Sequence, residues 1–281
     1  MPRTKILSLT LLAMIAFAGN SLLCRLALTD TGIDAASFTS IRIISGAIIL
    51  WLIVRLRGGE HRATGSWRSA LALFAYAAGF SFAYVNLTAA TGALLLFGAV
   101  QSTMIGYGLW RGERLHKRQT VGLACALAGL VGLLLPGLSA PPLLGSMLML
   151  GAGIAWGIYS LRGKGAGDPI CATAGNFIRA VPFSVGLSIA MLPFASVDQA
   201  GFWYAIASGA LTSGIGYAIW YTALRGLSST SAATVQLSVP VIAAIGGILF
   251  LGEAVTLRLL LASVAVLGGV ALVILSRPQA T

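Results

Sequence analysis

Apolar residues run along this chain in long stretches that are separated by short polar segments. A helix needs about 20 apolar residues to cross the hydrocarbon core of a membrane, and ten stretches approach this length. They cover residues 6–28, 35–56, 67–88, 92–110, 119–137, 143–161, 171–193, 199–222, 231–251 and 257–275. The brief connections leave no room for a soluble domain. The pattern therefore predicts an all-α integral membrane protein with ten transmembrane helices.

Composition supports this prediction and narrows it. Only 9% of the 281 residues are charged and 58% are hydrophobic, whereas soluble domains carry about 25% charged residues. The first apolar stretch extends to Leu28, so we expect an uncleaved membrane helix rather than a secretory signal. The three cysteines are isolated and lack the spacing of a disulfide framework or a zinc site. We expect neither a cofactor nor a metal.

Basic residues are distributed unevenly between the two sides of the predicted membrane. Of the 18 Lys and Arg residues, 14 lie at the termini or in the even-numbered connections, and only Arg258 lies in an odd-numbered one. Cytoplasmic loops carry the excess of positive charge, so we expect both termini in the cytoplasm and the chain in a bacterial inner membrane. This distribution argues against nucleic-acid binding, which the net charge of +11 would otherwise suggest.

A repeated phrase indicates that the chain has two halves. The segments LWRGERLHKR (109–118) and LFLGEAVTLR (249–258) share a Gly-Glu pair before a long apolar run, but the first copy is far more basic. Five predicted spans separate the copies, and an odd number of spans turns a repeat upside down in the membrane. A second match pairs AFAGNSLLCR (16–25) with AWGIYSLRGK (155–164). We therefore predict two inverted five-helix repeats, residues 1–140 and 141–281.

Inverted repeats favour a transporter. They are common in secondary transporters, which place the substrate site near the bilayer midplane between the halves. An intramembrane enzyme is disfavoured, because His61 and His116 lie in basic loops and the sequence holds no catalytic motif. A channel is disfavoured too, since rings of charge and filter motifs are missing. A membrane assembly factor without transport activity is the second hypothesis.

The second half carries a family resemblance. The segment SVPVIAAIGGILFLGEAVTLRLLLASVAVLGGVALV (238–273) is similar to EamA-type exporters of the drug/metabolite transporter superfamily, including Pro240 and the Gly252–Glu253 pair. The segment AYVNLTAATGALLLFGAVQ (83–101) resembles their aromatic amino-acid exporter branch. The resemblance implies export of a small-molecule substrate, an amino acid or a related metabolite, by alternating access. It also implies that helices one to four of each half line the pathway and that the fifth is peripheral.

Two further points stay open at this level. Another neutral metabolite or a drug is the alternative substrate. The oligomeric state is not determined by the sequence, which is compatible with a monomer in the lipid bilayer.

None of the seven acidic residues lies in the middle of a predicted span. Proton-coupled pumps commonly use buried Asp, Glu or His relays, so we expect downhill, facilitated export rather than tight coupling to protons. Glu113 and Glu253 end their helices. They could form gate ion pairs, but we favour terminal residues at the membrane surface, each paired with a nearby arginine.

Aromatic residues deep in the predicted spans are candidates for a cavity lining. In the third span Tyr76, Phe80 and Tyr84 are spaced by four residues, which places them on one face of a helix. Helix packing or lipid contact would explain any single ring, whereas their occurrence in spans 1, 3, 6 and 8 favours a shared substrate site. The predicted set is Phe17, Tyr76, Phe80, Tyr84, Trp156, Tyr159, Tyr217, Trp220 and Tyr221.

Three amide side chains inside the spans are further candidates for substrate binding. Asn20, Gln101 and Gln236 are costly in hydrocarbon unless each meets a hydrogen-bonding partner or water. They could bind the polar ends of an amino acid, and hydrogen bonding between helices is the alternative.

Two arginines and one proline complete the candidates. Arg42 and Arg179 occupy matching positions in spans 2 and 7, and a charged residue inside a span usually faces the protein interior. We favour a shared scaffold role for the pair over contact with a substrate carboxylate. Pro240, beside Gly246 and Gly247, predicts a hinge in span 9, with a matching bend in span 4.

Overall fold

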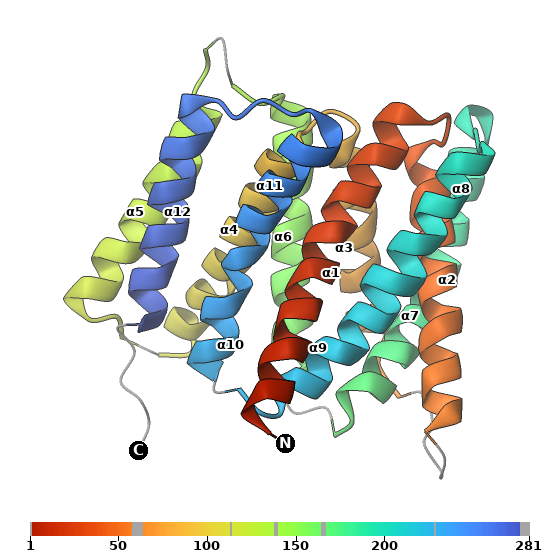
Figure 1. Cartoon of the computed structure of the whole chain (residues 1–281), viewed down its shortest axis with the longest axis horizontal. Helices are drawn as coiled ribbons and strands as arrows, with labels where there is room; N and C mark the ends of the chain where they lie inside the picture. Colours follow the sequence, from red (N-terminus) through yellow and green to blue (C-terminus); the bar gives the residue numbers. More distant parts are fainter. Residues whose placement is uncertain are drawn as a thin grey trace.

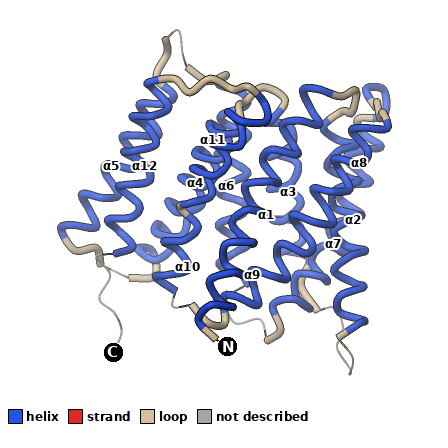
Figure 2. The backbone as a smooth tube through the Cα atoms, viewed as in Figure 1, coloured by secondary structure: helices blue, strands red, loops and turns tan. Residues whose placement is uncertain are grey.

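The computed structural model describes residues 2–57, 64–112, 114–137, 140–163, 167–227 and 229–275. All regular elements in these ranges are helices (Figure 2). They are α1 (Arg3–Asp30), α2 (Ala35–Leu56), α3 (Trp67–Tyr84), α4 (Ala89–Trp110), α5 (Lys117–Leu134), α6 (Leu143–Gly163), α7 (Pro169–Ala190), η1 (Leu192–Phe194), α8 (Gln199–Ile206), η2 (Ala207–Ile215), α9 (Gly216–Leu224), α10 (Ser229–Gln236), α11 (Ser238–Leu251) and α12 (Leu257–Leu275).

Ten membrane-spanning segments follow from the helices in the described ranges. Eight are single helices, the eighth span is α8, η2 and α9 in series, and the ninth is α10 followed by α11. Seven helical segments are long and apolar enough to cross a membrane on length and composition alone. The other three are α3 and α5, of 18 residues each, and the divided eighth span. The predicted ten-helix architecture is confirmed, and most helix ends lie within three residues of the predicted ends.

The two ends of the bundle are distinct. Helix α1 begins and α12 ends on the same side of the molecule (Figure 1), as an even number of spans requires. We call this side the terminal face and the opposite side the distal face. The α1–α2, α3–α4 and α11–α12 connections lie at the distal face (Figure 1).

The two repeats pack by exchanging their first helices. Helix α1 packs mainly on the eighth and ninth spans of the second half, and its inverted counterpart α6 packs mainly on α3 and α4 of the first half. Helices α2 and α7 pack on each other across the same boundary. The helices of the two halves therefore interlock, because each half packs its first two helices largely on the other.

The fifth helices of the two halves, α5 and α12, form a separate pair beside the bundle (Figure 1). Their backbones meet at two glycines. A Cβ on Gly269 would contact the carbonyl oxygen of Gly122, and a Cβ on Gly129 would lie 2.8 Å from the Cβ of Ala265. Small residues thus let α5 and α12 approach closely. In α6 a Cβ on Gly153 would lie 2.6 Å from the carbonyl oxygen of Leu96 on α4.

This contact gives a matched test of packing in the α5–α12 pair. We expect Gly269→Ala to destabilise the protein by about 1–3 kcal/mol, because overpacking against backbone atoms forces the helices apart. The neighbouring Gly268 has open space around its Cβ position. Gly268→Ala should therefore be neutral or stabilising by up to about 1 kcal/mol through helix propensity. Thermal unfolding in detergent measures both, and equal midpoints would contradict the assigned contact.

Two spans are interrupted near their centres. In the eighth span, Ala207–Ile215 winds as a π-helix of 9 residues, a rare form that often occurs at functional sites. In the ninth span, α10 ends at Gln236 and α11 begins at Ser238. Pro240 explains this break, because it has no N–H to donate to the carbonyl of residue 236 and its ring crowds that carbonyl. The structure shows an interruption where the hinge was predicted, but α4 continues unbroken from Ala89 to Trp110.

Candidate substrate site

The aromatic residues predicted from the sequence form one connected column through the bundle. Eight of the nine are joined by ring contacts, and Tyr221 faces the same cavity as Tyr159. The centroid distances are 4.7 Å for Tyr84–Phe80, 5.4 Å for Phe80–Tyr76, 4.7 Å for Tyr76–Trp156, 5.2 Å for Trp156–Tyr159, 5.2 Å for Trp156–Tyr217, 5.7 Å for Tyr217–Phe17 and 5.9 Å for Phe17–Trp220. The column draws on α1, α3, α6 and α9, so both halves contribute.

A polar cluster lies beside this column and is centred on Asn20 of α1. Its amide oxygen accepts hydrogen bonds from the hydroxyls of Ser208 (2.7 Å) and Thr212 (3.2 Å) in the π-helix. Its amide nitrogen donates to the hydroxyl of Tyr76 (3.4 Å). Asn20 is 5% exposed, so these bonds supply the partners that a buried amide needs.

Arg42 of α2 lies at the end of the same cluster and is the largest fully buried side chain described. Its Nη2 donates to the hydroxyl of Tyr76 at 2.9 Å and its Nε to the hydroxyl of Ser213 at 3.4 Å. The guanidinium carbon lies 4.8 Å from the ring centre of Phe80. Gly209 of the π-helix allows this placement, because a Cβ there would collide with the backbone carbonyl of Arg42.

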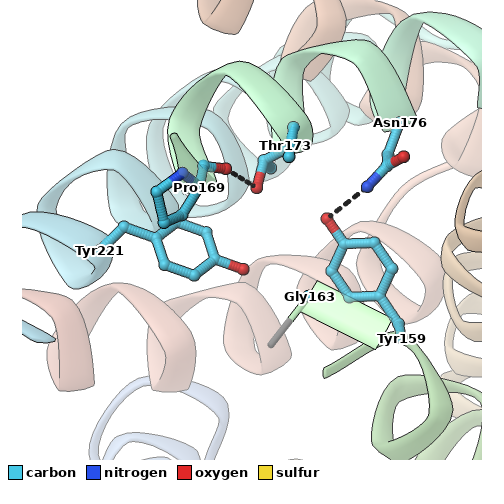
Figure 3. A pocket seen from close by; sticks show the side chains of 7 residues that line it. Tyr159, Gly163, Pro169, Thr173, Asn176 and Tyr221 are labelled. Carbon is cyan, nitrogen blue, oxygen red and sulfur yellow. Dashed lines mark hydrogen bonds between the residues drawn. The ribbon is translucent and has the colours of Figure 1, made fainter. Parts of the chain in front are cut away.

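A small cavity of about 20 Å³ lies at the terminal face, where α6 ends and α7 begins. Figure 3 shows Tyr159, Asn176 and Tyr221 around it, with the amide nitrogen of Asn176 donating to the hydroxyl of Tyr159 at 3.4 Å. Ligand pockets usually measure about 300–1,000 Å³, whereas this cavity has room for about one water molecule. We call it the entrance because it marks where the column reaches the terminal face, and it is too small to hold a solute in this conformation.

Asp168 lies at the edge of this entrance, at the N-terminus of α7. Burial tends to raise the pKa of its carboxyl group, but backbone N–H donors of Ile170 and Cys171 and the positive charge of Arg57 outweigh burial and lower this pKa below its usual value. The carboxylate therefore stays ionised, caps α7 and pairs with Arg57 at 3.0 Å.

A partly buried ion pair ties helices together at the distal face. Arg25 of α1 and Glu253, just after α11, approach to 3.4 Å. Glu253 also accepts a hydrogen bond at 2.9 Å from the backbone N–H of Ala89, the first residue of α4. Arg25 donates to the carbonyl oxygens of Tyr84 and Val85 at the end of α3. We call Arg25, Glu253 and these three backbone groups the distal latch, because they tie four helices together.

Other predictions from the sequence fare differently. Arg25 is not among the site residues predicted from the sequence, and the latch holds its side chain. Glu253 is paired with an arginine as expected, and its side chain is 10% exposed. Glu113 lies outside the described residues.

Arg42 and Arg179 have different partners in the structure. Arg179 is partly exposed and donates to the carbonyl oxygens of Thr64 and Gly175 at 2.8 and 3.0 Å. It fastens α7 to the segment before α3 and does not reach the column. Gln101 is buried on α4 and Gln236 is half-buried on α10, and in the described ranges no hydrogen bond joins either amide to the cluster.

Several site residues were missed from the sequence. Ser208, Thr212 and Ser213 are small hydroxyl residues of a kind common in membrane helices, and only the π-helix turns all three toward α1 and α2. Asn176 and Phe177 of α7 also join the column. An NFIR segment that matches FTSIR would have pointed to this turn of α7, although not to the amide itself.

The fold and this site are those of a membrane transporter: two inverted five-helix repeats, a polar centre between them, and different closures at the two faces. The EamA-like transporter family matches the chain twice, over residues 4–135 and 143–275. The chain belongs to this family and is a multi-pass membrane protein.

Similar proteins agree with this assignment. An uncharacterized protein of Pseudomonas aeruginosa is 56% identical over 99% of this chain and 97% of its own length. An uncharacterized transporter of Archaeoglobus fulgidus is 25% identical over 86% of this chain and 88% of its own. The threonine/homoserine exporter RhtA of Escherichia coli is 36% identical, but over only 44% of this chain and 43% of its own. A solved crystal structure shares the fold, with a TM-score of 0.67 at 16% identity over 99% of this chain and 100% of that one.

Proposed function

We propose that this protein exports amino acids from the cytoplasm by alternating access through the aromatic column. One observation carries the proposal: the two ends of the column differ, with a small cavity at the terminal face and the distal latch at the other. A pathway that opens to one side at a time is what alternating access requires, and inverted repeats provide two similar gates for it.

The direction of export rests on the charge distribution. Positive residues gather at the terminal face, which the positive-inside rule assigns to the cytoplasm. The entrance at Tyr159, Asn176 and Tyr221 would then admit solutes from inside the cell. The distal latch would be the gate toward the outside, and a bacterial inner membrane is the matching location.

Two observations support amino acids as the substrate class. RhtA, similar over less than half of this chain, is a threonine/homoserine exporter by name. The centre between the repeats combines hydroxyls, one amide and one guanidinium with ring faces, a mixture suited to a small zwitterion with an apolar side chain. An aromatic amino acid fits the second resemblance in the sequence. Another neutral metabolite is the competing candidate.

Radiolabelled flux in proteoliposomes tests the proposal. Vesicles preloaded with unlabelled threonine or phenylalanine should take up the labelled amino acid by counterflow faster than protein-free vesicles. The panel should include a neutral sugar and a cationic dye, which we expect not to exchange. If no amino acid exchanges while another solute of the panel does, amino acids are not the substrate class.

The same vesicles test the coupling. In the described ranges no carboxylate joins the column, and proton-driven pumps commonly use buried Asp, Glu or His relays. We expect an imposed proton gradient to leave the final amino-acid distribution unchanged. Uphill accumulation driven by the gradient would contradict facilitated export.

A further inference from the structure

We propose that Arg42 binds the carboxylate group of the exported solute. This inference rests on the proposed function and deepens it, since it assigns a chemical group of the substrate to one side chain.

The first step is the unpaired charge of Arg42. A guanidinium has five N–H donors and is charged at all ordinary pH values. Arg42 is 2% exposed, and its Nη1 has no hydrogen-bond partner in the described part of the chain. A buried charge is costly unless it is paired and hydrogen-bonded. Both N–H groups of Nη1 are therefore available to an acceptor that the described side chains do not supply.

The second step is that the described carboxylates are engaged elsewhere. Asp34, Asp168 and Asp198 cap the helices α2, α7 and α8, and Glu253 belongs to the distal latch. Asp30 is exposed at the end of α1. Of the ion pairs found between described residues, neither involves Arg42. The missing counter-charge is thus one that a solute can bring.

The third step is that the contacts of Arg42 differ from those of an arginine with a structural role. Arg179, at the matching position of the second repeat, shows what a structural arginine does here: its Nη1 donates to two backbone carbonyls. Arg42 bonds instead to two hydroxyls, and the ring centres of Tyr76 and Phe80 lie 5.2 and 4.8 Å from its guanidinium carbon. Hydroxyls and rings hold the cation in place without neutralising it.

The fourth step is access. From the cavity at the terminal face, Tyr159 stacks on Trp156, Trp156 contacts Tyr76, and the hydroxyl of Tyr76 accepts a hydrogen bond from Arg42. A solute that reaches the guanidinium from the entrance must displace the half-buried ring of Trp156 and then the side chain of Tyr76. Arg42 thus lies two aromatic layers beyond the entrance.

The chemical class follows from this geometry. An amino acid or a monocarboxylate brings the negative charge that Arg42 lacks, whereas a cation without a carboxylate is repelled. A charge-assisted hydrogen bond contributes roughly 1.5–3 kcal/mol, so removal of the carboxylate should weaken binding by about 10- to 100-fold.

Ligand-induced thermal stabilisation of the purified full-length protein tests this inference. The probes are threonine, threoninamide, phenylalanine, phenylalaninamide and 3-phenylpropionate. Stabilisation grows with ligand concentration relative to the dissociation constant, so each titration gives an affinity. We expect both amides to bind at least tenfold more weakly than their amino acids. Equal affinities of an amino acid and its amide would overturn the role of Arg42 while leaving amino-acid export standing.

The phenylpropionate arm distinguishes two sources of the carboxylate. If 3-phenylpropionate binds as tightly as phenylalanine, the site at Arg42 is supported, but it does not require an amino group. The flux panel then decides independently whether amino acids are the substrates. If neither amino acids nor phenylpropionate stabilise the protein at any soluble concentration, the site is wrong.

Two variants probe the residue itself. Arg42→Lys keeps the charge and should keep part of the preference for amino acids over amides. Arg42→Gln should abolish that preference. Retention of the full preference in Arg42→Gln would contradict the assignment. The ligand series on the unmodified protein decides the matter even if Arg42→Gln does not fold.

Discussion

Glu253→Gln is expected to open the distal face and to expose Cys24 to reagents added from that side. Cys24 precedes Arg25 and is 0% exposed in α1. The glutamine keeps an oxygen that can accept from the N–H of Ala89 but loses the charge that pairs with Arg25. Breaking a buried pair costs about 3–5 kcal/mol, and less here because the Arg25 side chain is 21% exposed. A loss of only about 1.4 kcal/mol raises the open population tenfold.

The measurement is the rate at which a membrane-impermeant maleimide labels Cys24 when Cys125 and Cys171 are replaced by serine. Arg258→Gln is the matched control. Arg258 lies after the same connection and donates to the carbonyl oxygen of Leu135, outside the latch. We expect labelling to accelerate at least about tenfold in Glu253→Gln and to stay unchanged in Arg258→Gln. Equal rates in the two variants would show that the latch does not govern access.

Comparison of Glu253→Ala with Glu253→Gln separates the effect of the ion pair from that of the hydrogen bond to Ala89. Glu253→Ala removes both the ion pair and the oxygen that accepts the N–H of Ala89, and loss of that hydrogen bond costs about 0.5–1.5 kcal/mol more. Its thermal midpoint should therefore lie below that of Glu253→Gln. Identical midpoints would mean that the hydrogen bond to Ala89 contributes little.

The sequence predicted the spans well because membrane crossing depends on local hydrophobic length. It predicted the aromatic column for a related reason: the spacing of Tyr76, Phe80 and Tyr84 already assigns them to one face. The interruption at Gln236 also follows from a local cause, the missing N–H of Pro240. These are features that each helix determines by itself.

The contacts that close the site depend on tertiary structure and could not be predicted in this way. Glu253 is 164 residues from Ala89, whose N–H it binds, and only the packing of α11 on α4 brings them together. The π-helix likewise depends on tertiary contacts for its role, since it packs closely on α2 at Gly209. The repeat suggested one shared role for Arg42 and Arg179. Inverted repeats share a backbone arrangement, but here the two side chains bind different partners.

Tyr76→Phe is expected to weaken the free protein and to strengthen carboxylate binding at the same time. The hydroxyl of Tyr76 accepts hydrogen bonds from Arg42 and from Asn20. Its removal leaves two buried donors without that partner, and each unsatisfied group costs about 1–3 kcal/mol, with the larger figure for the charged one. We expect a loss of roughly 2–4 kcal/mol in the free energy of unfolding. Tyr107→Phe, at a side chain that is 41% exposed, should change it by less than about 0.5 kcal/mol.

The gain in ligand binding follows from the geometry of the guanidinium. In the free protein one hydrogen bond from Nη2 goes to Tyr76, whereas Nη1 has no partner in the described residues. Without the hydroxyl, both nitrogens can turn their N–H groups to a carboxylate and bind it in a bidentate manner. Thermal titrations with phenylalanine should therefore show a lower midpoint without ligand and a larger ligand-induced rise than the unmodified protein. If both the midpoint and the rise decrease, Tyr76 contacts the solute itself and does not compete with it for Arg42.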